Sequence, residues 1–546
     1  MFFLFCLQFV SAQKWNLHIQ GIDSDQHQII DSIMYNKKHQ TLALLMAEKK
    51  VFENKLLQNG YFESKLVHEK KINDSIFSFT YNLNKQTKII LIDVTLNDDE
   101  RKLLNLEEKK LRLRPNQVSS FLEQGVSTLE KKGYALAQLQ LTHFISDGTL
   151  LKASLKLELN QKRVLNKIII EGYDGFPKGI KKAILKKFKQ QEFNQNNVAK
   201  IYKDFNALRF VVQKKYPEIL FKTDTTQVFV YLEKGKPNKF DGFVGFTNNN
   251  QNKLRFNGYL DLQLLNILNS GEQLNLIWKN DGAQQSSFNI GTEIPYLFKS
   301  PIGIKADLRI FKQDSTFQNT KTDFNLGYYL KYNSKLFLGY QSTSSVDIQK
   351  NMTLNVTDFN SAFITTSYDY NYFKSNETLF SEQSLVQLKI GTGNRTNETS
   401  KTRQFFGQII FSHHINLNNK NSIYIKNESF YLQSNSYLAN ELYRFGGINS
   451  IRGFNENSLQ ANAYSGIITE YRYKMASNIY LKSIIDYAYV QDKTTNTNNR
   501  LLGLGFGFGL LSKSGLFHFI YANGSQNQQS IKLSNTLVHV SFKAYF

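Results

Sequence analysis

Two spacings of apolar residues divide the chain near residue 239. In residues 14–239, stretches with apolar residues three and four positions apart alternate with short stretches in which every second residue is apolar. This mixture predicts helices and strands. In residues 241–546 only the spacing of two recurs, in about sixteen segments of roughly 6 to 15 residues separated by polar turns rich in Asn, Ser and Gly. The sequence therefore predicts an α+β amino-terminal half and an all-β carboxy-terminal half.

One order of elements, a strand followed by helical sequence and a hairpin, occurs three times in residues 14–239. The opening strands are expected at 16–20, 88–96 and 164–171, and the main helices at 41–58, 118–131, 178–187 and 197–210. The hairpins are expected at 61–68 with 76–83, 135–144 with 150–159, and 218–221 with 227–232. A unit of about 75 residues is too long for a solenoid repeat, so three small βααββ domains are predicted. Each has an exposed edge strand that can pair with an extended chain, which needs no catalytic residue.

A short junction follows the long helix in two of the units. It reads Gly60-Tyr61 and Gly133-Tyr134, as expected where glycine ends a helix, whereas the third unit has Lys215-Tyr216. The repeated order and these junctions resemble the polypeptide-transport-associated (POTRA) domain. The resemblance implies POTRA-like domains at 13–84, 85–160 and 161–239, followed by a β domain at 240–546.

The carboxy-terminal half is predicted to be a 16-stranded antiparallel transmembrane barrel. A strand with its turn takes about 19 residues, which suits membrane strands of roughly 9 to 11 residues that alternate between lipid and lumen. Many segments carry Tyr or Phe at their ends, and the last proline is Pro301. A soluble β-sandwich or propeller is the alternative. The last segment, 538–546, alternates and contains Phe542 and Phe546, which resembles the sorting signal of bacterial outer-membrane barrels.

The first twelve residues, MFFLFCLQFVSA, are predicted to be a signal peptide that is cleaved before Gln13. A lipid anchor on Cys6 and a buried strand are the alternatives. Cys6 is the only cysteine, so the exported chain would hold no thiol for a disulfide, a metal site or a nucleophile. No run of about 18 apolar residues is present, which excludes a spanning helix and leaves a barrel as the form that can cross a membrane.

The formal net charge is +22, which raises nucleic acid, anionic lipid and acidic proteins as partners. The excess lies in scattered pairs such as Lys181-Lys182 and Lys186-Lys187, which is typical of solvated helix faces. For residues 178–189, contact with anionic lipid head groups is the alternative.

A glycine-rich segment, YRFGGINSIRGFNENS at residues 443–458, separates two predicted strands. Gly446 and Gly447 allow a tight backbone path, and Gly453 lets the chain turn away after Arg452. An exposed basic loop outside the membrane is one interpretation. The other is a loop inside a polar lumen, where an arginine is best matched by carboxylates.

The next two predicted strands each offer one carboxylate, Glu470 and Asp486, on the face opposite their apolar neighbours. Eight residues of the glycine-rich segment look like the inward-folded sixth loop of the POTRA-plus-barrel superfamily of outer-membrane insertases and translocases (BamA/TamA-like, bacterial surface antigen type). They are Arg444, Phe445, Gly446, Gly447, Ile451, Arg452, Gly453 and Phe454. In layout the chain is most similar to TamA. The resemblance implies that Arg452 docks on Glu470 and Asp486. Ala488 stands where the family often has glycine, which leaves the contact around Asp486 open.

The resemblance also implies a non-enzymatic factor of the bacterial outer membrane with its amino-terminal domains in the periplasm. The POTRA-like domains would capture unfolded outer-membrane or secreted clients, and the barrel would insert or translocate them at the seam between its first and last strands. The lipid bilayer and a periplasmic or inner-membrane protein are further expected partners, and nucleic acid is not. No cofactor, metal site or catalytic residue is expected. A dedicated secretion pore for one partner protein is the alternative.

Two other motifs are interpreted as structural. Four glycines between Gly503 and Gly509 alternate with larger residues and no helix follows, so they predict a strand with one bare face that another backbone approaches, not a nucleotide-binding loop. His413 and His414 are neighbours on a strand, so their rings should point to opposite faces, and no partner ligands for a metal are identified.

Overall fold

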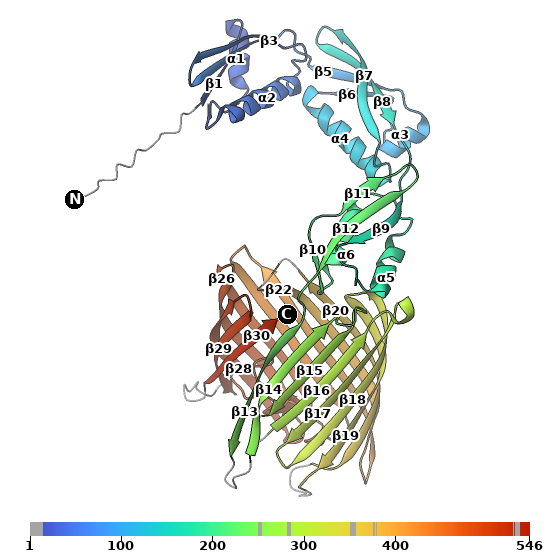
Figure 1. The fold of residues 1–546 in the computed structure, drawn as a ribbon, viewed down its shortest axis with the longest axis vertical. Helices are drawn as coiled ribbons and strands as arrows, with labels where there is room; N and C mark the ends of the chain where they lie inside the picture. The colour runs from blue at the N-terminus through green and yellow to red at the C-terminus, as the bar shows by residue number, and fades with distance from the viewer. Residues whose placement is uncertain are drawn as a thin grey trace, which may run out of the picture. The chain divides into compact units, whose positions relative to one another are not determined.

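The computed structural model describes residues 15–248, 254–280, 285–349, 356–374, 377, 379–527, 529 and 536–546. The predicted signal peptide, residues 1–12, lies outside the described residues. The chain forms two compact units, one with the first two α/β modules and one with most of a third module and a β-barrel (Figure 1).

The first module is a four-stranded sheet with two helices. Its elements are β1 (Trp15–Gly21), α1 (Ser24–Ser32), β2 (Lys38–His39), α2 (Leu42–Gln58), β3 (Lys65–Asn73) and β4 (Ile76–Asn82), with the strand order β2-β1-β4-β3. Thr41 caps the start of α2, and its hydroxyl accepts a hydrogen bond from the Leu44 N–H at 3.3 Å. Phe52 of this helix is fully buried in the module core, with its ring 5.9 Å from that of Tyr81 of β4. Gly60 ends the helix with φ +89°, as the sequence predicted.

The second module repeats this plan. Its elements are β5 (Ile89–Val94), α3 (Asp98–Leu104), β6 (Lys110–Leu113), α4 (Pro115–Lys131), β7 (Gln138–Asp147) and β8 (Leu150–Glu158), in the order β6-β5-β8-β7. Gly133 ends α4 at φ +92°, and the Tyr134 N–H donates to the Leu129 carbonyl at 3.0 Å. In both modules the opening strand lies parallel to the last strand of the hairpin, and the two helices lie in the long connection between them.

The third module consists of β9 (Leu165–Glu171), α5 (Lys178–Phe188), α6 (Gln195–Asn206), β10 (Val211–Gln213), β11 (Glu218–Phe221) and β12 (Thr226–Lys234). The expected helix 197–210 was four residues too long at its end. Leu208 and Phe210 continue the apolar spacing because both are fully buried, although the chain there is no longer helical. The expected junction at Lys215-Tyr216 was also wrong, since these residues follow β10 and not a helix.

The βααββ pattern was incomplete in a second respect. Each module contains an additional short strand, β2, β6 or β10, that pairs at one side of its sheet. These strands have between two and four residues, which is too short for an alternating pattern to be recognised in the sequence.

Residues 239–545 form a closed barrel of sixteen strands, and the predicted fold class is confirmed. The strands are β13 (Lys239–Asn248), β14 (Leu254–Leu265), β15 (Gln273–Asn280), β16 (Gln285–Ile294), β17 (Ile302–Gln313), β18 (Phe317–Lys331), β19 (Ser334–Asp347), β20 (Phe359–Phe373), β21 (Glu382–Thr396), β22 (Lys401–Asn416), β23 (Asn421–Gln433), β26 (Ala463–Ala476), β27 (Ile479–Asp492), β28 (Thr497–Leu511), β29 (Gly515–Gln526) and β30 (Leu537–Tyr545). All neighbouring strands are antiparallel. Each pairs with the next barrel strand along the chain, and β13 pairs with β30 to close the ring. The ring excludes the sandwich and propeller alternatives.

The alternation along each strand separates an apolar outside from a polar inside. On β18, Phe324, Leu326 and Tyr328 are exposed on the outer surface, whereas Asp323 and Asn325 are buried on the other face. The last strand, β30, likewise exposes Val538, Val540 and Phe542. This pattern suits a barrel with an apolar environment outside and a polar lumen inside.

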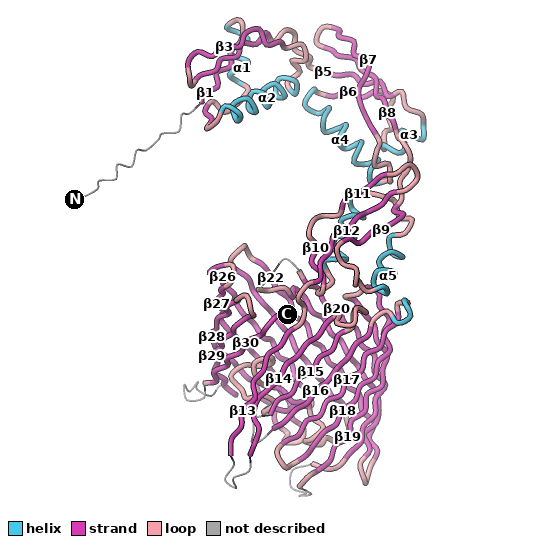
Figure 2. The backbone as a smooth tube through the Cα atoms, in the orientation of Figure 1, coloured by secondary structure: helices cyan, strands magenta, loops and turns pink. Residues whose placement is uncertain are grey.

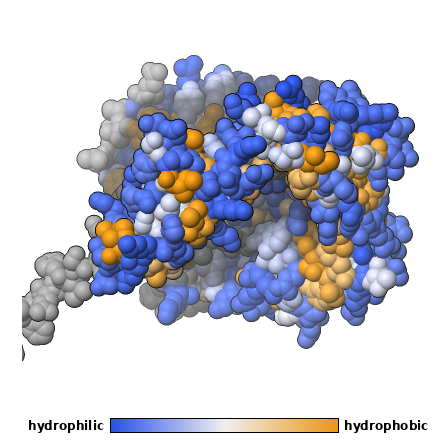
Figure 3. Space-filling model, turned by 90° about the horizontal axis from the view of Figure 1, so that it is seen from above, coloured by the Kyte–Doolittle hydropathy of each residue, from blue (hydrophilic) through white to orange (hydrophobic). Residues whose placement is uncertain are grey.

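Helices are confined to the amino-terminal half of the described chain, apart from the short turn η1 (Leu297–Lys299) between β16 and β17 (Figure 2). No helix among the described residues is long and apolar enough to cross a membrane. The view in Figure 3 shows a mostly hydrophilic face with separate hydrophobic patches.

Candidate functional site

The candidate site is built by the segment between β23 and β26, residues 434–462. Two short strands within it, β24 (Tyr443–Phe445) and β25 (Leu459–Ala461), pair as an antiparallel ribbon. The ribbon stacks on the barrel wall, with the Tyr443 ring 4.6 Å from that of Phe430 and the Phe445 ring 4.1 Å from that of Tyr464. Between β24 and β25 the chain forms a tip, residues 446–458.

The glycines of the tip have conformations that other residues rarely adopt. Gly446, Gly447 and Gly453 have φ values of +109°, +92° and +87°. A Cβ atom on Gly446 would lie 2.5 Å from the Asn455 carbonyl oxygen, because the two sides of the tip run close together. The glycines therefore allow the compact turn that the sequence predicted.

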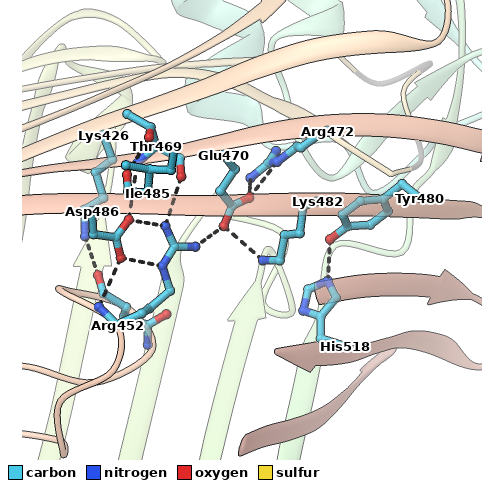
Figure 4. A network of polar contacts seen from close by, with 11 residues as sticks. Lys426, Arg452, Thr469, Glu470, Arg472, Tyr480, Lys482, Ile485, Asp486 and His518 are labelled. Carbon is cyan, nitrogen blue, oxygen red and sulfur yellow. Dashed lines mark hydrogen bonds and ion pairs between the residues drawn. The ribbon is translucent and has the colours of Figure 1, made fainter. Parts of the chain in front are cut away.

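Arg452 lies at the end of this tip and contacts both predicted acids (Figure 4). Its Nε and Nη2 atoms donate to the two carboxylate oxygens of Asp486 at 2.7 and 2.5 Å, and its backbone N–H donates to Asp486 Oδ2 at 3.1 Å. Its Nη1 atom donates to Glu470, and its Nη2 atom also donates to the Thr469 carbonyl at 3.3 Å. Arg452 is 2% exposed and Asp486 is fully buried. The planar guanidinium uses both of its edges, which a lysine could not do.

Two further cations share Glu470. Lys482 Nζ lies 2.9 Å from its Oε1 atom, and Arg472 Nε lies 2.7 Å from its Oε2 atom. Three cations thus surround two carboxylates, and Figure 4 shows them as one connected network. Because desolvated charges are costly unless every one is paired, the network favours an arrangement in which each charge has a partner. Removal of one member leaves the others uncompensated.

An apolar cluster flanks this network on the same strands. Phe445 and Ile451 of the loop pack with Ala488, Val490 and Leu501 of the barrel wall, and all five are buried. Ala488 is the residue that departs from the family pattern. Its methyl group is fully buried in this cluster, and Asp486 binds Arg452 through both oxygens. Alanine at this position is compatible with the contact.

Comparison with solved structures finds proteins of similar overall fold. CdiB from Acinetobacter baumannii is similar with a TM-score of 0.52 and 14% identity, over 92% of this chain and 98% of that chain. CdiB from Escherichia coli has a TM-score of 0.53 and 12% identity over the same shares. BamA from Haemophilus ducreyi lacking POTRA domains 1–3 has a TM-score of 0.47 and 16% identity, over 83% and 99%. No protein-family model and no curated protein matches the sequence.

The chain has the POTRA-plus-barrel fold. The resemblance predicted from the sequence is thereby confirmed for the fold. The connections between strands can be counted on the side of the barrel where β13 ends. On that side of this POTRA-plus-barrel chain, the segment 434–462 is the sixth connection, as the loop motif implied. Arg444 of that motif lies in β24, with its guanidinium 5.5 Å from the Phe317 ring.

A second buried arginine holds the other side of the loop, and the sequence analysis missed it. Arg395 of β21 pairs with Glu441 and donates to the Ser436 hydroxyl at 2.6 Å. Glu441 also accepts from Gln404 at 2.9 Å, and Asn440 donates to the Ser345 hydroxyl at 2.7 Å. The only signal in the sequence was a charged residue on the inward face of β21, which does not identify a partner about 46 residues away.

The tip is tied to a third part of the wall, again by residues that the sequence did not reveal. Glu456 accepts from Lys279 of β15 at 2.7 Å, and the Asn449 carbonyl accepts from Lys426 of β23 at 2.6 Å. Beside these contacts lies a cavity of about 1070 Å³ lined by charged residues of the lumen, including Asp241, Glu382 and Lys543. The loop therefore crosses the lumen and leaves a polar space next to it.

The glycine-rich strand β28 lies against the backbone of the tip. A Cβ atom on Gly503 would be 2.4 Å from the Arg452 carbonyl oxygen, and one on Gly524 of β29 would be 2.4 Å from that of Gly453. This is the close approach of another backbone that the alternating glycines predicted. The adjacent histidines of β22 lie on opposite faces of the strand, as predicted. His413 contacts the Ser384 hydroxyl at 2.8 Å, and the buried His414 ring packs on Phe380. Among the described residues no group of three or more side chains could hold a metal ion.

Replacing Gly503 with valine is expected to displace the tip, because the new side chain and the Arg452 carbonyl cannot occupy the same space. Overpacking of this kind costs about 1 to 3 kcal/mol. Limited proteolysis of the purified barrel should then cut within residues 446–458 faster than in the wild type. Gly407→Val is the matched control, since nothing lies within 4 Å of a Cβ atom at Gly407 of β22. Equal cleavage of both variants would contradict the close contact.

Proposed function

We propose that this chain is a factor of the bacterial outer membrane that captures unfolded client proteins and inserts or translocates them through its barrel. The three modules, as POTRA domains at residues 13–84, 85–160 and 161–239, lie in the periplasm. Arg452, with Glu470 and Asp486, keeps the lumenal loop seated while clients are handled. The observation that carries this proposal is the short seam between β13 and β30.

The seam is joined over a small part of its length. Among the described residues, β13 pairs with β30 at Lys239 with Tyr545 and at Phe240 with Ala544. Beside these pairs, Asn238 and Phe546 exchange two backbone hydrogen bonds of 3.3 and 3.2 Å. By contrast, β13 pairs with β14 from Lys239 to Asn248, and β30 pairs with β29 from Leu537 to Ala544. Most of the facing edges of the first and last strands therefore lack a ladder. In a membrane, each unpaired backbone group costs several kcal/mol, so a client strand that pairs there is stabilised.

The modules offer a second place where an extended chain can bind. Strand β3 lies at the edge of its sheet, and all nine of its residues are exposed. Leu66, Val67 and Ile72 are among them, so the edge combines free backbone groups with apolar side chains. An unfolded segment could add to this edge as a further strand, with main-chain hydrogen bonds giving affinity for many sequences. Such binding requires no bond to be made or broken, so the chain acts without catalysis.

A dedicated secretion pore for one partner protein is the second candidate. The structures that support it are the two CdiB barrels, which have the same fold over most of their length. In that case the partner passes through the lumen, and the loop must move away from its contacts with the barrel wall. The charged cavity beside the loop is the start of such a path.

Photo-crosslinking in living cells tests the proposal and separates the two candidates. A crosslinker is placed at Phe243 in β13 and, separately, at Phe542 in β30, one on each side of the seam. Recovery of many unrelated barrel proteins supports the assembly factor, and recovery of a single exported species supports the pore. Tyr487, which is exposed on the outer face of β27, is the control position. Equal recovery of proteins from the seam positions and from Tyr487 would contradict the assembly factor, because its clients must pair at the seam.

A further inference from the structure

A groove lined by lysines lies where the third module meets the barrel. It has a volume of about 620 Å³ and lies between α5, the turn η1 and the turn that joins β18 to β19. Five lysines line it: Lys182, Lys186, Lys187, Lys299 and Lys331. Among the described residues of the lining, the one carboxylate is Asp204, which pairs with Lys187. Burial, together with nearby Asp204, raises the pKa of Tyr296, so this phenol stays neutral and adds no negative charge.

The groove is held in shape by close packing of α5 on the turns of the barrel. A Cβ atom on Gly179 would lie 2.8 Å from Cβ of Tyr296, so the helix approaches η1 as closely as glycine permits. One on Gly271 would lie 2.6 Å from Cδ1 of Ile180. The Tyr296 ring in turn lies 5.1 Å from that of Tyr329. The lysines of α5 are thus fixed relative to the barrel wall.

One side of the groove continues into the apolar outer surface of the barrel. Tyr328 and Leu330 line it and are 52% and 55% exposed, as the last outward residues of β18. Phe298 of η1, also in the lining, is 97% exposed with φ +52°. Few residues other than glycine adopt this conformation, and here it turns a large apolar side chain away from the protein. An apolar side chain so exposed next to lysines is typical of residues at a membrane interface.

We propose that this groove binds the head group of an anionic glycerophospholipid in the leaflet nearest the modules. Lys182, Lys186, Lys299 and Lys331 bind the phosphate and the other anionic groups of the head group. Phe298 and Leu330 contact the acyl chains. The proposal uses the part of the proposed function in which the barrel spans a bilayer, and it is independent of any client.

The charge distribution of the turns favours a lipid over a soluble anion. Three other exposed positions at this end of the barrel also carry lysine in a turn or at its edge: Lys374, Lys420 and Lys513. A surface with this excess of positive charge attracts the anionic head groups of a whole leaflet, by roughly 1 kcal/mol for each lysine near the membrane. The groove differs from the other turns because it adds a walled space and exposed apolar side chains to the charge.

Native mass spectrometry of the full chain in detergent tests the proposal with phosphatidylglycerol and phosphatidylcholine of equal chain length. The wild type should retain phosphatidylglycerol at least about tenfold better, given the contribution expected of each lysine. The groove variant Lys182→Gln/Lys186→Gln/Lys299→Gln/Lys331→Gln should lose this preference. The turn variant Lys374→Gln/Lys420→Gln/Lys513→Gln is the matched control and should keep it. Heat-modifiable mobility on gels verifies that both variants keep the barrel.

Two outcomes would overturn the proposal. The first is that the groove variant retains phosphatidylglycerol as the wild type does, or loses no more of it than the turn variant. The second is displacement of the lipid by inorganic phosphate at equal concentration, which would identify the ligand as a soluble anion.

A further variant, Phe298→Ser, should weaken retention of both lipids without removing the preference between them, because it removes apolar contact and leaves the charge. Transport of a client is not measured, so failure here is distinct from failure of the proposed function.

Discussion

Replacing Arg452 with alanine should abolish the function of the chain while the barrel persists. The change leaves Asp486 and Glu470 buried without the guanidinium that bridges them, and breaking a buried pair of this kind costs about 3 to 5 kcal/mol. That cost falls on the docking of the loop, because the ladders of β26 and β27 do not depend on the Arg452 side chain. The measurement is rescue of a deletion strain, together with heat-modifiable mobility as a test of the barrel.

Two other substitutions make this result specific. Arg452→Lys keeps the charge but cannot contact both oxygens of Asp486 and Glu470 at once, so it should rescue only in part. Arg500→Ala removes an exposed arginine from the neighbouring strand β28 and should rescue fully. If Arg452→Ala rescues the deletion as well as the wild type does, the lumenal loop has no part in the function.

The sequence predicted the barrel well because its physical cause is local. A strand with lipid on one side and a polar lumen on the other must alternate, and β18 and β27 do so over most of their length. The same alternation is enough to predict from the sequence that Glu470 and Asp486 lie on the inner face. The glycines that follow α2 and α4, Gly60 and Gly133, were predicted from equally local signals.

What the sequence did not reveal depends on which residues meet across space. Arg395 and Glu441 are unremarkable in their own segments, and only the closure of the ring brings the loop to β21. The short strand β2 exists because β1 provides a partner, since two residues have no pattern of their own. The length of the seam also cannot be predicted from the sequence, because β13 and β30 each alternate like any other strand. Only their register in the structure shows how few residues of the two strands pair with each other.

A disulfide across the seam should stop the insertion of clients under oxidising conditions and restore it after reduction. Phe240→Cys with Ala544→Cys joins two residues that are register partners in β13 and β30, where opposite Cβ atoms in antiparallel strands are about 4.5 to 5.5 Å apart. The native seam is short enough to part at modest cost, and a covalent bond removes that possibility. Activity of the locked protein should fall to that of the deletion strain, measured as the level of folded client barrels.

The control places the same chemistry one strand away. Phe519→Cys with Val540→Cys joins β29 to β30, which are paired along most of β30, so this disulfide should leave activity unchanged. The locked seam also separates the two candidate functions. A factor that inserts strands between β13 and β30 needs the seam to open, whereas a pore that uses the lumen does not. Secretion of a single partner that continues through a fully oxidised seam would therefore assign the chain to the pore, and loss of client insertion that returns with reductant would assign it to assembly.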